Sequence, residues 1–156
     1  MLKNYLYIFL ISMVPLVELR LAVPASQALE LPMLPSLIIC MIGNLLPMPF
    51  IYLFARRILE WGADKALIGG ICRFFLEKGH KAGRKMTEKA GRTGSFIALM
   101  LFVGIPVPGT GAWTGTLAAS ILELGIKTTT AAVALGVFIA GLIMMAASTV
   151  GFSLIG

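Results

Sequence analysis

Glu18 and Arg20 are the two residues of this sequence whose types and positions most clearly indicate chemistry. Both lie in an apolar stretch, residues 5–29, between Pro15 and Pro24. In a membrane each charge would cost about 2.5–3.5 kcal/mol on insertion scales, so such residues usually have a function and a partner. The guanidinium of Arg20 can donate two parallel hydrogen bonds, which is typical of a site for phosphate or carboxylate. Glu18 could take up a proton at low dielectric constant and is the candidate for proton coupling.

A structural role for the same two charges is the alternative. Residues two positions apart point to different sides of a helix, so Glu18 and Arg20 cannot form an i,i+4 ion pair. Each is therefore expected to face a cavity or the opposite half of the protein. Either charge could instead anchor the tip of a bent segment.

The uncharged segment Gly104–Gly115 is the second candidate site. Its prolines and glycines prevent a continuous helix, because proline removes a backbone donor and glycine permits positive φ. The helix that follows would present free N–H groups, and such a helix start binds anions in broken transporter helices. It could complete an anion site with Arg20, or its glycines could only permit close helix packing.

Asn44 and Trp113 are weaker candidates. Asn44 could contact a substrate, but hydrogen bonding between helices is the commoner use of such a residue in membranes. Trp113 could anchor the chain at the interface or stack on an apolar tail. The predicted substrate-binding residues are Arg20, Asn44, Gly109, Thr110, Gly111 and Trp113. The predicted hinge or hairpin-breaking residues are Pro15, Pro24, Pro47, Pro49, Pro106 and Pro108.

The composition indicates whether these residues lie in a soluble or a membrane protein. Of the 156 residues, 58% are hydrophobic and only 13% are charged, and the mean hydropathy is +0.94. Soluble domains have about 25% charged residues, so an integral membrane protein is predicted. Four apolar stretches approach the length of a membrane span, namely residues 5–29, 33–55, 95–122 and 129–155.

Positive charge is concentrated in the middle of the chain. Ten of the thirteen Lys and Arg residues and four of the seven acidic ones lie in residues 56–94, which carry the whole net charge of +6. This asymmetry places the segment in the cytoplasm. Its mixture of apolar and basic residues predicts amphipathic helices at the membrane surface, with a solvated loop as the alternative. Nucleic-acid binding is not expected, because no groove-entering motif or aromatic platform accompanies the charge.

A weak internal repeat relates the two halves. Val14-Pro15 matches Ile105-Pro106, and Leu29-Glu30-Leu31 matches Leu122-Glu123-Leu124 at an offset two residues larger. Each half therefore contains a broken apolar stretch followed by one long span. If each broken stretch enters and leaves the membrane on the same side, the second half is inverted relative to the first.

We therefore predict an all-α integral membrane protein with two inverted repeats, each a re-entrant helical hairpin followed by a transmembrane helix. The single membrane domain, residues 1–156, divides into repeat 1 (1–55), a basic amphipathic cytoplasmic linker (56–94) and repeat 2 (95–156). Both termini are then expected opposite the linker. The location is the cytoplasmic membrane of a prokaryote.

The segments Pro15–Pro24, Gly43–Pro47 and Phe102–Gly115 resemble a bacterial and archaeal family labelled small multidrug export proteins. More distantly, the arrangement resembles the DedA superfamily, whose paired re-entrant hairpins are implicated in moving phospholipids or polyprenyl-phosphate carriers. The resemblance implies a proton-linked role for Glu18 and a head-group role for Arg20. The second hairpin departs from the DedA pattern, since Gly111 stands where an arginine is expected.

The leading functional prediction is a DedA-like transporter or lipid translocase for an amphipathic, anionic-headed substrate. The alternatives are a proton-coupled exporter of cationic hydrophobic drugs and a non-transporting, membrane-organising subunit. The sequence contains no catalytic or metal-binding motif, so no enzyme activity, cofactor or metal is expected. The expected partners are membrane lipids, the substrate and, because exposed breaks need covering, a second copy in a homodimer.

Overall fold

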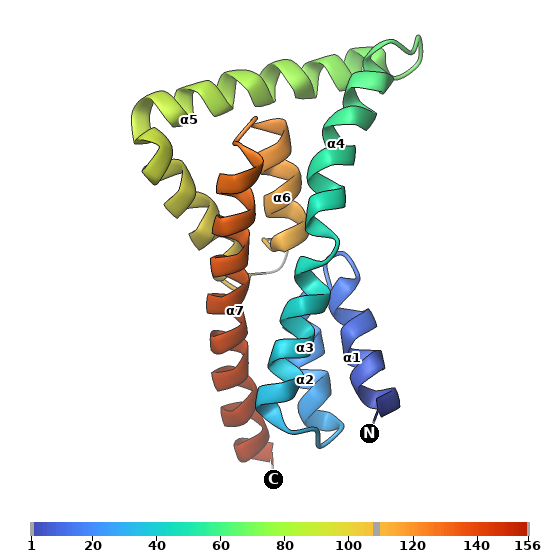
Figure 1. Cartoon of the computed structure of the whole chain (residues 1–156), viewed down its shortest axis with the longest axis vertical. Coiled ribbons are helices and arrows are strands. Elements are labelled where there is room, and N and C mark those ends of the chain that lie inside the picture. Colours follow the sequence, from blue (N-terminus) through green and yellow to red (C-terminus); the bar gives the residue numbers. More distant parts are fainter. Residues whose placement is uncertain (1, 108–109, 156) are drawn as a thin grey trace.

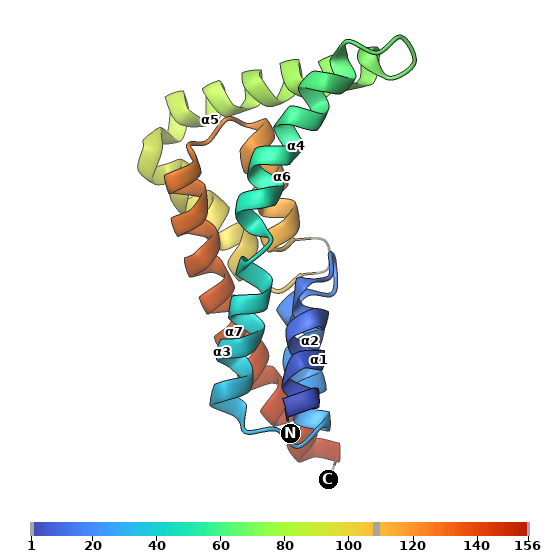
Figure 2. The same ribbon diagram turned by 45° about the vertical axis from the view of Figure 1, so that its right-hand side comes forward.

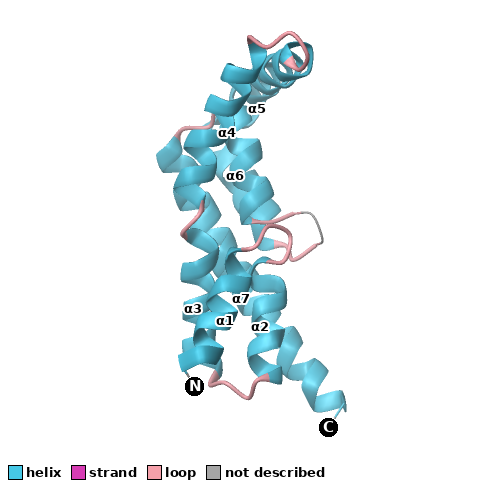
Figure 3. Ribbon diagram, turned by 90° about the vertical axis from the view of Figure 1, so that its right-hand side faces the viewer, coloured by secondary structure: helices cyan, strands magenta, loops and turns pink. Residues whose placement is uncertain are grey.

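The computed structural model describes residues 2–107 and 110–155, and helices and loops make up this part of the chain (Figure 3). Pro108 and Gly109, both predicted site residues, lie outside the described residues. The described residues form seven helices: α1 (Leu2–Met13), α2 (Glu18–Ala28), α3 (Met33–Leu45), α4 (Met48–Ala63), α5 (Gly69–Gly104), α6 (Ala112–Ile121) and α7 (Ile126–Ile155).

Two long helical rods run along the molecule (Figure 1). One is α3 followed by α4, and the other is α7. Met33–Ala63 and Ile126–Gly151 each contain an 18-residue window of high mean hydropathy, 2.0 in the first and 2.3 in the second, and are long and apolar enough to cross a membrane. These two stretches contain most of the two full spans predicted from the sequence, residues 33–55 and 129–155.

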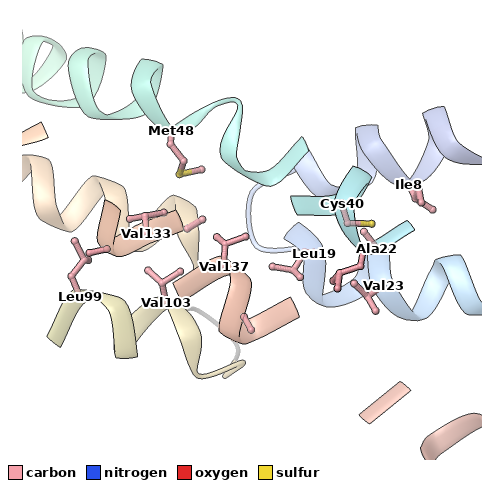
Figure 4. Packing of buried hydrophobic residues seen from close by; sticks show 14 of the residues in the cluster. Ile8, Leu19, Ala22, Val23, Cys40, Met48, Leu99, Val103, Val133 and Val137 are labelled. Carbon is pink, nitrogen blue, oxygen red and sulfur yellow. The ribbon is translucent and has the colours of Figure 1, made fainter. Parts of the chain in front are cut away.

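The shorter helices form two pairs at opposite ends of the rods. The α1–α2 pair lies in the half that holds both termini, while the end of α5 pairs with α6 in the other half (Figures 1 and 2). The turns of both pairs lie near mid-length and approach each other there. Buried apolar side chains from several helices, including Leu19 of α2, Cys40 of α3, Val103 of α5 and Val137 of α7, pack around this level (Figure 4).

The prolines differ in their effects. Pro15 lies in the turn between α1 and α2, and Pro47 lies between α3 and α4. Pro49 is in the first turn of α4, where its missing N–H is harmless. The prediction that Pro24 breaks the first stretch is wrong, because α2 continues through it. Membrane helices tolerate an internal proline when neighbouring groups satisfy the carbonyl that it leaves free.

The basic segment begins within α4 and continues into α5. Gly91, at φ 66° and ψ −176°, divides α5 at a kink. The part before the kink lies across the end of the molecule (Figure 1). Its exposed residues include Ile71 and Phe74 beside Lys and Arg side chains, a composition typical of a helix at a membrane surface.

The two Leu-Glu-Leu sequences adopt the same turn. Glu30 and Glu123 have φ values of 53° and 58°. In each turn the glutamate N–H donates to the carbonyl oxygen of the residue three positions earlier. The N–H of the leucine that follows the glutamate donates to the carbonyl oxygen of the residue five positions before that leucine. This is the hydrogen-bond pattern of a Schellman cap, usually built on glycine. The match found in the sequence therefore extends to backbone conformation.

Gly43 and Gly136 also occupy comparable positions, where α3 meets α1 and α7 meets α5. A Cβ on Gly43 would lie 2.1 Å from the Ser12 hydroxyl and 2.7 Å from the Phe9 carbonyl oxygen. A Cβ on Gly136 would lie 2.7 Å from the Met100 carbonyl oxygen. Close helix packing therefore requires glycine at both places.

Gly43→Ala and Gly136→Ala are each expected to lower the free energy of unfolding by about 1–3 kcal/mol, because the added methyl overpacks the helix contact. Thermal unfolding in detergent measures the effect. Gly151→Ala is the matched control on α7, since a Cβ there meets nothing within 4 Å. Equal stability of all three variants would contradict this packing.

Candidate functional site

The candidate site lies where the turns of the two helix pairs meet. We call it the charged junction and define it as Glu18 and Arg20 of α2 with residues 105–107 and 110–113. The chain must leave its helix at both turns. Leu16 and Glu18 have φ values of 68° and 50°, and α5 ends at Gly104 before Pro106. The loop residues are thus brought beside the first turn of α2.

Glu18 occupies the N-terminus of α6. Its carboxylate accepts hydrogen bonds from the backbone N–H groups of Ala112 (3.1 Å) and Trp113 (3.0 Å). The residue is only 2% exposed. A helix N-terminus presents unpaired N–H groups and a partial positive charge, so a carboxylate is stabilised there. The chain's own carboxylate therefore fills an anion-binding position.

Gly111 makes room for this carboxylate. A Cβ at Gly111 would lie 2.2 and 2.5 Å from the two carboxylate oxygens of Glu18. The backbone of Gly111 is extended, with φ −165°, a conformation open to any residue. Space for Glu18 is thus the reason for glycine here.

Arg20 binds the loop between α5 and α6, on the side where α5 ends. Its guanidinium donates to the carbonyl oxygens of Val107 and Ile105, the latter at 3.4 Å, and to the Thr110 hydroxyl at 3.0 Å. The Thr110 hydroxyl lies 2.9 Å from the same two carbonyl oxygens. Arg20 therefore satisfies carbonyl groups left free where α5 ends. Its Nε is buried and has no hydrogen-bond partner among the described residues.

Glu18 thus binds backbone N–H groups at the start of α6, and Arg20 binds backbone carbonyl groups after the end of α5. The two charges therefore satisfy the two kinds of polar group that the break between these helices leaves free. The sequence predicts that Arg20 and the start of this helix form an anion site, and the structure does bring them together. The group at the start of α6 is the Glu18 carboxylate, however, while Arg20 donates to the carbonyl oxygens of the loop before it. The junction therefore presents a carboxylate and a guanidinium to the two sides of one loop.

Trp113 connects the junction to an apolar groove. Its indole N–H donates to the Met13 carbonyl oxygen at 3.1 Å, across the turn of the other helix pair. Its side chain also lines a groove of about 780 Å³ between α4 and α6, which extends to Pro15 and Leu16. One residue therefore contacts Glu18 through its backbone and the groove through its side chain.

Asn44 lies elsewhere on the buried face of α3. It is 0% exposed, and neither polar atom of its side chain has a hydrogen-bond partner among the described residues. The expected bond to another helix is not formed by these atoms. Cys40 and Met48, one turn to either side, are buried with it, and Met48 accepts a hydrogen bond from Thr116 of α6.

A second polar cluster was not predicted from the sequence. Glu123 lies 2.9 Å from Nη2 of Arg56 and 2.8 Å from Nδ1 of His80. Glu123 thus joins the α6–α7 turn to α4 and α5, whose contacting residues, Arg56 and His80, lie far from Glu123 in the sequence. The duplicated Leu-Glu-Leu was the available signal, since a glutamate at an exposed turn beside a basic segment can attract a cation.

The comparisons with known proteins gave one similarity. The sequence model of a protein family described as "Putative small multi-drug export protein" matches residues 18–143, from Glu18 through the charged junction into α7. No curated protein and no solved structure matches the chain.

Proposed function

We propose, since this chain belongs to the family of small multi-drug export proteins, that it is a proton-coupled transporter of amphipathic molecules with anionic head groups. The family description supports a membrane protein of the export class. Two helices suited to crossing a membrane agree with that setting. The nature of the substrate and the coupling to protons are our proposal.

The observation that carries this proposal is the pair of hydrogen bonds from the backbone at the start of α6 to the Glu18 carboxylate. A pair of N–H groups that holds a carboxylate can hold a sulfonate or phosphate in the same way. While Glu18 is ionised, it occupies this position itself. When Glu18 takes up a proton, its charge is lost and its attraction to the start of α6 weakens.

The released helix start then accepts the head group of the substrate. Arg20 follows Glu18 by two residues and contacts Thr110 beside the same loop. It supplies a permanent positive charge close to the entering anion. Proton uptake and anion binding are thereby linked, and by reciprocity each favours the other.

The proposed membrane arrangement has two re-entrant hairpins, α1–α2 and the end of α5 with α6, in two inverted repeats. The matched glutamate turns and matched glycine contacts support it. Irregular backbone at membrane depth is tolerated when protein shields it, and Glu18 and Arg20 satisfy polar groups of the broken loop. The basic part of α5 would then lie on the cytoplasmic surface.

Cysteine labelling tests this topology. In a background without Cys40 and Cys72, an impermeant thiol reagent added to intact cells should modify cysteine at Lys3 or Ser153 and leave Arg84→Cys unmodified. The whole net charge lies near Arg84, which favours its cytoplasmic location. Labelling at Arg84 with protection at Lys3 and Ser153 would overturn the topology.

Substitution of Arg20 tests the class of substrate. We expect Arg20→Ala to reduce transport of an alkyl sulfonate in proteoliposomes by more than about tenfold, a loss of over about 1.4 kcal/mol. Arg20→Lys should retain part of the activity, because it keeps the charge but loses the planar fork. Size-exclusion profiles identify variants that fail to fold.

A hydrophobic cationic dye serves as the comparison substrate. Both oxygens of Glu18 face backbone N–H groups, which leaves them poorly placed for a cation. Dye export by the wild type and by folded Arg20→Ala, without sulfonate transport by either, would refute the anionic substrate in favour of a cationic drug.

A further inference from the structure

The apolar groove beside Trp113 is the strongest feature that the charged junction does not explain. It is lined on α6 by Trp113, Leu117 and Ile121, and on α4 by Phe50, Phe54 and Ile58. Each set repeats every four residues, so each forms a stripe along one side of its helix. The two stripes face the same groove.

The shape of the groove indicates an extended occupant. The first and last residues of each stripe are eight positions apart, which is about 12 Å at 1.5 Å per residue. The groove has a volume of about 780 Å³, and Thr114 supplies the one hydroxyl among its lining residues. A hydrocarbon chain lying parallel to α4 and α6 matches these dimensions and this chemistry.

The end of the groove defines where a polar head would lie. Leu16 and Trp113 line the groove, and Leu16 is two residues from Glu18, while the backbone N–H of Trp113 binds the Glu18 carboxylate. The opposite end reaches Ile58 and Ile121. A molecule with its chain in the groove can therefore present its head to the N-terminus of α6.

We propose that the α4–α6 groove binds the hydrocarbon tail of the substrate, which makes the substrate a long-chain anionic amphiphile. This inference rests on the proposed function and names the substrate class for the same site. Exposed liners, with Leu117 at 41% and Phe54 at 53%, leave the groove open along its side. The tail can enter from the surrounding lipid while the head moves at the charged junction.

Photolabelling in proteoliposomes tests the groove. The probe is an alkyl sulfonate with a diazirine in the middle of its chain, and labelled residues are identified by mass spectrometry. We expect labels to concentrate on Phe54 and Leu117. Leu117→Trp, which fills the groove, should reduce this labelling by at least about tenfold, equivalent to 1.4 kcal/mol.

Leu135→Trp on α7 is the matched control, because Leu135 is 47% exposed and does not line the groove. It should leave the labelling unchanged. Absent labelling, even labelling over α4, α6 and α7, or labelling that Leu117→Trp does not reduce would overturn the groove. A disulfide between Leu117→Cys side chains of two copies, with no groove labelling, would assign the face to self-association instead.

Transport of the same probe is measured in the same vesicles. Transport with evenly distributed labels refutes the tail groove and leaves the proposed function intact. Groove labelling without transport in wild-type protein refutes the proposed function and retains a binding site for amphiphiles.

Discussion

Glu18→Gln is expected to abolish transport driven by a proton gradient while preserving anion binding at every pH. In the wild type, the ionised carboxylate occupies the N–H groups of Ala112 and Trp113. Protonation frees them, so affinity for an anion should rise as pH falls. One linked proton gives at most about a tenfold rise per pH unit. Glutamine carries no charge in any of these conditions and should show a flat profile.

Affinity of wild type and Glu18→Gln for an alkyl sulfonate is measured across mildly acidic to mildly alkaline pH. The sulfonate is chosen because its charge stays constant over this range. Parallel pH profiles for the two proteins would contradict the role of Glu18. The carboxylate would then be a structural cap for α6, as helix N-terminal carboxylates often are.

Gly111→Ala is expected to reduce both stability and transport, because its methyl group would overlap the Glu18 carboxylate. The distances of 2.2 and 2.5 Å to the two oxygens leave no room for a Cβ. Displacing a buried carboxylate from its N–H partners should cost about 2–4 kcal/mol. Transport should fall by more than about tenfold. Unfolding in detergent and flux into proteoliposomes measure the two effects.

Two further variants separate this clash from a general effect of the methyl group. Gly125→Ala is the control, since a Cβ there meets nothing within 4 Å. In a Glu18→Ala background, Gly111→Ala should cost little additional stability, because the overlapping carboxylate is gone. A cost as large as in the wild-type background would show that the two residues are not coupled.

The breaks could be predicted because proline and glycine act locally. Pro15, and Pro106 with its neighbouring glycines, interrupt the helices where the sequence indicates. The long apolar spans were equally accessible, since their length alone sets the requirement. Pro24 was misjudged because the local rule is not absolute, and α2 continues through this residue.

The partners of the charged side chains could not be predicted from local sequence patterns. Glu18 contacts residues 94 and 95 positions later, and Arg56 and His80 converge on Glu123. A pattern along the chain shows which groups need partners but does not show which groups the fold places side by side. The sequence therefore suggested Arg20 for the helix start, although Glu18 occupies it.

Proton uptake on substrate binding is the most direct test of the central claim that Glu18 is displaced from α6 by the anion. Titration calorimetry of the alkyl sulfonate in buffers with different ionisation enthalpies counts the protons exchanged. At a pH where Glu18 is ionised in the free protein, we predict uptake of about one proton per anion bound by the wild type and none by Glu18→Gln. Binding without proton uptake in the wild type, or equal uptake in both proteins, would contradict the account.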